Sequence, residues 1–223
     1  MKDALPDLVF LNRLLNYFFG YVVAESDIGL GNFEFALSDA LKDTSSESYE
    51  RLFKSWVSII NKLWRKNNGK KQKECVTLSN IKTEISDLIR TEIIGETLYS
   101  CQFLALRLER KCIHDPALLK DYDEIVKKIA VEPEMKMSSG YFAYHVMFYF
   151  KSGNILEVQI YSSMMKKWRD LSHHLYEIVR LNPTNKPEFG TTESRMISLG
   201  HLLHLAECEI DRLQKELPNL GPR

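Results

Sequence analysis

Two alternating apolar segments near the middle of the chain restrict its possible folds more than any other feature of the sequence. Residues 142–150 (FAYHVMFYF) and 155–161 (ILEVQIY) carry an apolar side chain at every second position, and Ser152-Gly153-Asn154 lies between them. Side chains alternate between the two faces of a sheet along a strand, and Gly and Asn favour hairpin turns. The pattern therefore predicts adjacent antiparallel strands at 142–150 and 155–161.

The alternation separates the side chains of this hairpin into an apolar and a polar face. Pairing across the loop is predicted to place Tyr149 opposite Glu157 and His145 opposite Tyr161. The face predicted to be buried carries five apolar side chains: Phe148, Phe150, Leu156, Val158 and Ile160. The polar residues His145, Glu157 and Gln159 share the other face, so the hairpin predicts a potential active surface.

Most of the remaining chain has the periodicity of helices. Helices are predicted in six segments: residues 8–22, 33–41, 98–111, 116–129, 163–181 and 192–217. A further helix is predicted after the capping residues 44–47, with an apolar stripe made of Phe53, Val57, Ile60 and Trp64. A third strand is predicted within residues 85–94.

The order of these elements predicts one α+β domain, in which helices flank a small, mostly antiparallel sheet. No internal repeat and no linker divides the sequence into two cores. We expect N-terminal helices in residues 1–45, a core in residues 46–181 and a C-terminal helix in residues 190–217 of a single domain that spans 1–223.

The composition excludes several classes of protein. Thirty Lys and Arg residues balance thirty Asp and Glu residues, which argues against binding to nucleic acid or membrane through bulk charge but leaves room for a local basic patch. Four cysteines have no C-x-x-C spacing, so no zinc ribbon or disulfide framework is predicted. The apolar run at 14–24 is too short to span a bilayer, and we expect a cytoplasmic protein without a membrane partner.

A basic segment follows the helix that carries Trp64. Residues 65–73 (RKNNGKKQK) contain five Lys and Arg residues and a glycine, which is typical of an exposed turn. Two interpretations remain open: a solvated loop, or a lip that contacts a polyphosphate.

Three potential metal ligands lie on the last predicted helix. His201, His204 and Cys208 share one face of that helix, opposite an apolar stripe that includes Leu199 and Ile210. Zinc sites use such side chains, but structural sites have four ligands and the sequence shows no fourth. A polar face or a subunit contact is therefore favoured over a metal site.

Five segments bring candidate catalytic residues in a definite order. They are Lys54 to Leu63 with Ser58 and Lys62, Ile85 to Ile89 with Asp87, Gly140 to His145 with Tyr141, Glu157 to Ile160 with Gln159, and Met165 to His173 with Trp168. This order resembles the synthetase domain of the RelA/SpoT family, which produces the alarmones (p)ppGpp, and the resemblance covers residues 54–173. No single segment is specific, but all five in this order are difficult to obtain by chance.

The resemblance implies a nucleotidyltransferase-like fold and the transfer of pyrophosphate from ATP to a ribose hydroxyl. The acceptor would be GDP, GTP, an adenine nucleotide or a tRNA end. Asp87 and Glu157 would hold Mg²⁺, which prefers oxygen ligands. Alternatively, Glu157 would help to deprotonate the attacking hydroxyl.

The resemblance also implies roles for six further residues. Lys54 and Lys62 would neutralise the phosphates of ATP, and Ser58 would form a hydrogen bond beside them. Tyr141 would stack on the acceptor base. His145 would orient the acceptor, and Gln159 would hold Glu157.

The sequence departs from the family pattern at four positions where the family has arginine. These positions hold Leu52, Glu92, Phe142 and Tyr161. None of these side chains can form the bidentate, charge-assisted bonds that arginine forms with phosphate. Two hypotheses follow: an enzyme that binds its nucleotides differently, or a binding or regulatory module that keeps the fold without the activity.

Overall fold

A mixed five-stranded sheet forms the centre of the molecule, in a computed structural model that describes residues 2–24, 33–35, 37, 51–137, 139–181 and 188–216. In spatial order the strands are β1 (Phe33–Phe35), β2 (Ile89–Gly95), β5 (Ile155–Ser162), β4 (Tyr141–Phe150) and β3 (Val126–Lys136). Strands β2 and β5 are parallel and the other three pairings are antiparallel, so the predicted mostly antiparallel sheet is confirmed.

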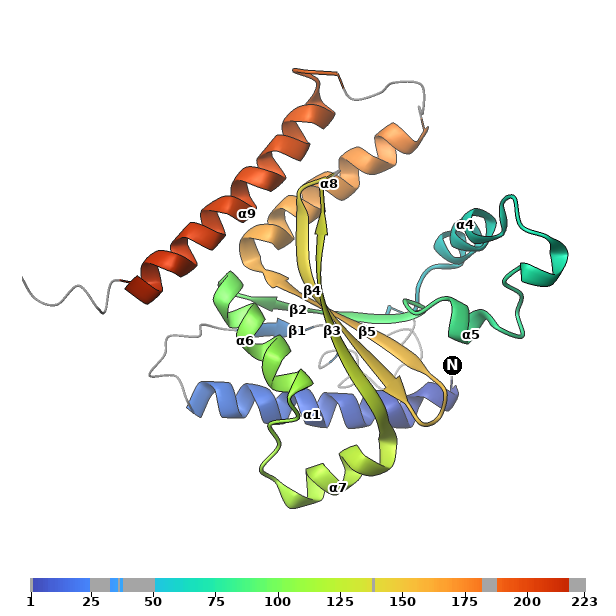
Figure 1. The fold of residues 1–223 in the computed structure, drawn as a ribbon, viewed down its shortest axis with the longest axis vertical. Coiled ribbons are helices and arrows are strands. Elements are labelled where there is room, and N and C mark those ends of the chain that lie inside the picture. Colours follow the sequence, from blue (N-terminus) through green and yellow to red (C-terminus); the bar gives the residue numbers. More distant parts are fainter. Residues whose placement is uncertain are drawn as a thin grey trace, which may run out of the picture.

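Helices surround this sheet. They are η1 (Lys2–Ala4), α1 (Leu5–Ala24), α4 (Trp56–Asn67), η3 (Gln72–Glu74), α5 (Ile81–Glu84), α6 (Leu98–Glu109), α7 (Pro116–Ile125), α8 (Ser163–Leu181) and α9 (Thr192–Glu216). In the view of Figure 1, α1 and α7 lie below the sheet, α8 and α9 above it, and α4 and α5 to the right. Within the described residues, no helix has both the length and the apolar character needed to cross a membrane.

The main core lies between helices α1 and α6 and one face of the sheet. Leu11 of α1 and Leu104 of α6 are fully buried there, together with Ile93 of β2, Phe148 of β4 and Val158 of β5. The five apolar side chains predicted for the inner face of the hairpin all belong to this core. The opposite face of the sheet carries the polar side chains of the hairpin and, beside them, a smaller apolar cluster that includes Met165 and Trp168 of α8.

The hairpin has the predicted strands but a different register. Glu157 lies opposite Met147, and Gln159 lies opposite His145, which is two residues away from the predicted pairing. The turn is shifted by one residue toward the N-terminus, because the backbone N–H of Phe150 donates to the carbonyl of Asn154 at 3.0 Å and residues 151–153 form the connection. A change in pairing by an even number of residues keeps every side chain on its face, so His145, Glu157 and Gln159 still share one surface.

Two predicted helices contain strands instead. Residues 33–35, which begin the helix predicted at 33–41, pair with β2 as an antiparallel edge strand. The helix predicted at 116–129 ends at Ile125, and Val126 begins β3. Pro133 lies inside β3, where it weakens the sequence signal for a strand, and it is tolerated because β3 is the outer strand of the sheet.

Helix α4 begins later than predicted and exposes its apolar stripe. Ser55 caps the helix by accepting a hydrogen bond from the backbone N–H of Ser58 at 3.3 Å, whereas the predicted caps at 44–47 lie outside the described residues. The predicted stripe of Val57, Ile60 and Trp64 faces solvent, and Ile59 is the buried residue. The preceding residues pair with β2, which fixes the rotation of the helix.

Two glycines allow helix α9 to approach the turn between β3 and β4. A Cβ atom on Gly140 would lie 2.6 Å from the backbone nitrogen of His201 and 2.7 Å from the carbonyl carbon of Gly200. A Cβ atom on Gly200 would lie 2.8 Å from both the carbonyl oxygen of Ser139 and Cε2 of Trp168. No other residue type fits at these two contacts without displacement of backbone.

The same contact turns the polar face of α9 toward the sheet. His204 and Glu207 are buried, whereas Leu199 and Ile210 of the apolar stripe are exposed. The ring of His204 stacks on Phe142 with centroids 4.4 Å apart. The predicted polar face of α9 is thus partly interior.

Candidate active site

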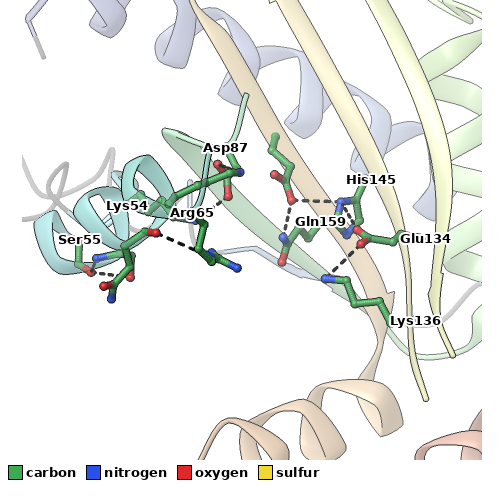
Figure 2. A network of polar contacts seen from close by, with 12 residues as sticks. Lys54, Ser55, Arg65, Asp87, Glu134, Lys136, His145 and Gln159 are labelled. Carbon is green, nitrogen blue, oxygen red and sulfur yellow. Dashed lines mark hydrogen bonds and ion pairs between the residues drawn. The ribbon is translucent and has the colours of Figure 1, made fainter. Parts of the chain in front are cut away.

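The polar face of the sheet and helix α4 line an open cleft of about 960 Å³. Seven of the eight predicted site residues line it: Lys54, Ser58, Lys62, Asp87, His145, Glu157 and Gln159. They come from the segment before α4, from α4 itself, from the residues before β2, and from β4 and β5. Figure 2 shows Lys54 and Asp87 on one side of the cleft and Gln159 and His145 on the other.

A carboxylate held between two lysines occupies one side of the cleft. Lys54 Nζ donates to Oδ2 of Asp87 and Lys62 Nζ donates to Oδ1, each at 2.6 Å. Backbone pairing sets this geometry, because the N–H of Lys54 donates to the carbonyl of Leu88 at 2.9 Å. Partial burial acts to raise the pKa of Asp87, but the hydrogen bonds and charges of the two lysines outweigh it and lower the pKa.

Glu157 occupies the other side of the cleft and is only 5% exposed. Its Oε1 accepts a hydrogen bond from the side-chain amide of Gln159 and lies 3.2 Å from Nδ1 of His145. Burying an ionised carboxylate is unfavourable unless it is hydrogen-bonded, and these two groups supply that stabilisation. The structure thus places Gln159 where it holds Glu157, which is the contact that the resemblance implied.

His145 links Glu157 to a second carboxylate on the edge strand. Its Nδ1 also lies 2.9 Å from Oε2 of Glu134, and Lys136 lies 3.1 Å from Oε1 of Glu134. Carboxylates only accept hydrogen bonds, so Nδ1 of His145 carries the proton in this arrangement. Glu134 and Lys136 were not predicted as site residues, because no strand was predicted at residues 126–136. Residues 126–131 (VKKIAV) show only partial alternation.

Tyr141 lies outside the lining of the cleft and packs in a second apolar cluster. The ring is 8% exposed and contacts Tyr161, Met165 and Trp168 in that cluster. Its hydroxyl lies 3.3 Å from Nε2 of His145. Burial raises the pKa of Tyr141, which keeps the hydroxyl protonated as a donor to His145. Stacking of this ring on a base would require the surrounding cluster to open.

Two of the four positions without arginine have structural roles. Leu52 is buried in the main core. Phe142 stacks on His204, and its ring also contacts Tyr144 edge-on at 5.3 Å. Both side chains therefore pack against apolar or aromatic groups.

The other two positions form a charged cluster with helix α8. Arg169 donates to Oε2 of Glu92 at 2.6 Å and also to the hydroxyl of Tyr161, which itself donates to Glu92. Partial burial acts to raise the pKa of Glu92, but the hydrogen bonds of Tyr161 and Arg169 and the charges of Arg169 and Lys166 lower it. The negative charge of Glu92 is therefore neutralised by α8.

Breaking this pair should destabilise the protein in a pH-dependent way. We expect Arg169→Met, which keeps the aliphatic stem, to lower the free energy of unfolding by about 1–2 kcal/mol, because it leaves the carboxylate of Glu92 partly desolvated.

Since the pKa of Glu92 is lowered from 4.5, its stabilisation is complete above that value and is lost as the pH falls through the lowered pKa. The difference in stability between wild type and Glu92→Gln should therefore be larger at pH 7 than at pH 4, as measured by urea unfolding. An equal difference at both pH values would contradict the assignment.

Two arginines also line the cleft: Arg65, which belongs to the basic segment 65–73, and Arg90, which was not among the predicted site residues. Arg90 lies on the same face of β2 as Glu92 and opposite Glu157 of β5 in the parallel ladder. Arg65 extends from α4 toward Gln159, as Figure 2 shows. In the part of the chain that the structure describes, neither arginine has an acidic partner. Arg90 follows Asp87 by three residues, and this spacing could have identified it.

The carboxylates of the cleft fit a magnesium ion that is shared with phosphates. Mg²⁺ commonly binds one or two protein carboxylates and completes its shell with phosphate and water oxygens. Asp87 and Glu157 supply such oxygens, although both oxygens of Asp87 accept from lysines here. Among the described residues, no three His, Cys, Asp or Glu side chains are grouped to hold a metal.

The three potential ligands on α9 do not converge. Nε2 of His204 lies 3.7 Å from the thiol of Cys208, whereas Nε2 of His201 lies 2.9 Å from the carbonyl of Met137. Burial, together with the nearby charge of His201, lowers the pKa of His204. These histidines serve the packing of α9.

Comparison with known proteins agrees with this architecture. A family model described as the region found in RelA / SpoT proteins matches residues 51–177. No curated protein matches the chain in sequence.

Three solved structures share the fold. One is the small alarmone synthetase 1 from Bacillus subtilis bound to its product pppGpp, with 16% identity, a TM-score of 0.58, and coverage of 95% of this chain and 92% of that chain. The small alarmone synthetase 2 from Bacillus subtilis has 18% identity, a TM-score of 0.55, and coverage of 96% and 98%. A GTP pyrophosphokinase family protein from Streptococcus pneumoniae has 13% identity, a TM-score of 0.57, and coverage of 99% and 96%. The predicted synthetase-type α+β fold is therefore confirmed.

Proposed function

This chain belongs to the RelA/SpoT family, and on that basis we propose that it is a pyrophosphokinase that transfers pyrophosphate from ATP to the ribose hydroxyl of a nucleotide acceptor. The observation that carries the proposal is the convergence of Lys54, Lys62, Asp87 and Glu157 in one cleft. Pyrophosphoryl transfer needs cations beside the phosphates and a carboxylate beside the attacking hydroxyl, and the cleft provides both.

Lys54 and Lys62 bind the phosphates of ATP in this proposal. Without a ligand their charges are neutralised by Asp87 at 2.6 Å, so the cleft holds two ammonium groups that are already oriented. Phosphate oxygens can replace the carboxylate oxygens as acceptors from either lysine, and Ser58 lies on the same side of the cleft. A lysine that turns to a phosphate frees one oxygen of Asp87.

Glu157 acts on the acceptor. Gln159 and His145 hold its Oε1, which orients the carboxylate toward a ligand in the cleft. Glu157 accepts the proton as the ribose oxygen forms a bond to the β-phosphorus of ATP, and the bond from that phosphorus to the α,β-bridging oxygen breaks, which releases AMP. Mg²⁺ held by Asp87 and Glu157 supplies charge neutralisation when bound.

Arg65 and Arg90 take over phosphate binding from the positions that lack arginine. Both guanidinium groups line the cleft, and Arg90 is adjacent to Glu157 across the β2–β5 ladder. Guanidinium binds phosphate oxygens in a bidentate manner, which the residues at 52, 92, 142 and 161 cannot do. The cleft thus keeps guanidinium groups that can bind phosphate, although fewer of them than the family pattern implies.

Affinity for ATP should accordingly be modest and depend on Arg90. With a Kd near 1 mM, 10 mM Mg-ATP would stabilise the folded protein by about 1.4 kcal/mol, and little shift in Tm is expected below 1 mM. We expect Arg90→Gln to weaken binding about tenfold, which would reduce the stabilisation at 10 mM to about 0.4 kcal/mol. Arg110→Gln, at the exposed end of α6, is the matched control for loss of one guanidinium. Equal thermal shifts in the two variants would exclude Arg90 from the nucleotide site.

Transfer of label tests the function directly. The protein would be incubated with Mg²⁺ and γ-labelled ATP together with GDP, GTP, an adenine nucleotide or tRNA, and the products would be separated. We expect label on one acceptor and release of AMP in equal amount. Absence of transfer to every acceptor would refute the proposed activity.

The missing arginines favour one alternative. If Mg-ATP shifts the melting temperature but no acceptor receives label, the chain is a nucleotide-binding module that has kept the fold without catalysis. The two measurements together separate these functions.

A further inference from the structure

The basic charge of this protein is concentrated in one segment next to the cleft. Residues 51–73 contain eight Lys and Arg side chains and no Asp or Glu, in a chain whose net charge is zero. Three of these side chains, Lys70, Lys71 and Lys73, are exposed, and none has an acidic partner among the residues that the structure describes. This segregation creates a local positive field that the overall charge balance conceals.

The same segment exposes two tryptophan side chains. Trp56 and Trp64 are 74% and 68% exposed, although indole rings are usually buried. They lie eight residues apart on α4, which corresponds to a rise of about 12 Å. Val57 and Ile60 are also exposed beside them. We call Trp56, Trp64, Lys70, Lys71 and Lys73 the α4 surface.

The α4 surface is continuous with the cleft. Trp64 and Arg65 line the cleft together with Lys62, so one end of the surface enters the proposed nucleotide site. In Figure 1, α4 and the turn that follows it lie on the opposite side of the molecule from α9. A ligand that covers the surface would therefore reach the cleft without contacting the C-terminal helix.

Charge and shape distinguish between possible occupants. A second copy of this chain would bring Lys70, Lys71 and Lys73 of one copy close to the same three exposed lysines of the other, which is unfavourable. A flat bilayer could contact Trp56 but could not follow the surface into a concave cleft. A flexible polyanion with flat aromatic groups satisfies both features, because aromatic side chains stack on bases while lysines neutralise phosphates.

We propose that the α4 surface binds single-stranded nucleic acid. Trp56 and Trp64 stack on bases, Lys70, Lys71 and Lys73 contact the phosphate backbone, and the strand leads into the cleft past Arg65. The choice of a polynucleotide over other polyanions rests on the proposed nucleotide chemistry of the cleft.

Fluorescence anisotropy of labelled 12-nucleotide oligo(U) and oligo(dT) tests the proposal on the full chain, without ATP. We expect binding that weakens with salt, and Trp56→Ala and Trp64→Ala should each weaken it at least about fivefold. Replacing Lys70, Lys71 and Lys73 together by Gln should reduce the slope of log K against log salt by about 2. The two oligonucleotides distinguish RNA from DNA as the source of the strand.

Matched controls separate the α4 surface from general effects. Leu202→Ala and Leu205→Ala remove side chains that are each 63% exposed on α9, and Lys120, Lys127 and Lys167 replaced by Gln remove three charges elsewhere. These controls should bind as wild type does. No binding at low salt, or equal binding by the tryptophan variants, would overturn the proposal. Binding to anionic vesicles that oligo(U) does not displace would assign the surface to membranes instead. None of these outcomes bears on pyrophosphate transfer, because the assay contains no ATP.

Discussion

Glu157→Gln is expected to lower the rate of pyrophosphate transfer about 100- to 10,000-fold, which is the usual contribution of a positioned general base. The variant keeps an oxygen that can accept from Gln159 and lie beside Nδ1 of His145, so the polar contacts in the cleft persist while the proton acceptor is lost. Its melting temperature should remain close to that of wild type. The measurement is transfer of label from γ-labelled ATP at saturating Mg²⁺ under single-turnover conditions.

Glu132→Gln is the matched control for this substitution. Glu132 also lines the cleft, but it is exposed and forms no hydrogen bond or ion pair with Glu157. We expect it to keep activity within a few-fold of wild type. Equal activities in the two variants would show that the carboxylate of Glu157 does not take part in the reaction.

Gly140→Ala is expected to lower the free energy of unfolding by about 3 kcal/mol or more. The new Cβ would lie within 2.8 Å of backbone atoms of Gly200 and His201, and φ at Gly140 is +75°, which is unfavourable for alanine. Backbone cannot rotate away as a side chain can, so α9 must move from the sheet. We expect loss of the stacking between His204 and Phe142 as a consequence.

Gly153→Ala provides the comparison, because Gly153 has a φ of +87° but no atom within 4 Å of the added Cβ. It should cost only about 1–2 kcal/mol, the price of the left-handed conformation. Urea unfolding of both variants, with hydrogen exchange of α9 amides, measures the difference. Equal destabilisation would mean that the contact with α9 contributes nothing.

Local patterns predicted the hairpin, β2 and both long C-terminal helices, whereas the two edge strands, β1 and β3, were missed. Residues 142–161 contain both partners of their pairing, so alternation and a turn suffice to identify them. Residues 33–35 form a strand only because they pair with β2, where Phe33 lies opposite Gly95, and no local pattern reveals this pairing. The register of the hairpin was predicted wrongly because it depends on the conformation of the loop residues.

The candidate site was predictable where residue identity and order are sufficient. The sequence grouped Asp87 with Lys54 and Lys62, and the structure joins them by ion pairs. It could not show that Glu92 is neutralised by Arg169, because that contact joins residues 77 positions apart. The ion-pair partner of a charged residue is defined only by the fold when the two residues are far apart in the sequence.

The parallel pairing of β2 with β5 also determines when, during synthesis of the chain, the cleft can form. Strands β3, β4 and β5 follow one another and pair as neighbours, so they can assemble soon after synthesis. Ile89 of β2, however, pairs with Leu156 of β5. The segment that carries Asp87 can therefore take its final position only after β5 has been synthesised. A nascent chain that ends before β5 has Lys54, Lys62 and Asp87 but lacks the strand that carries Glu157, so the two sides of the cleft cannot yet come together.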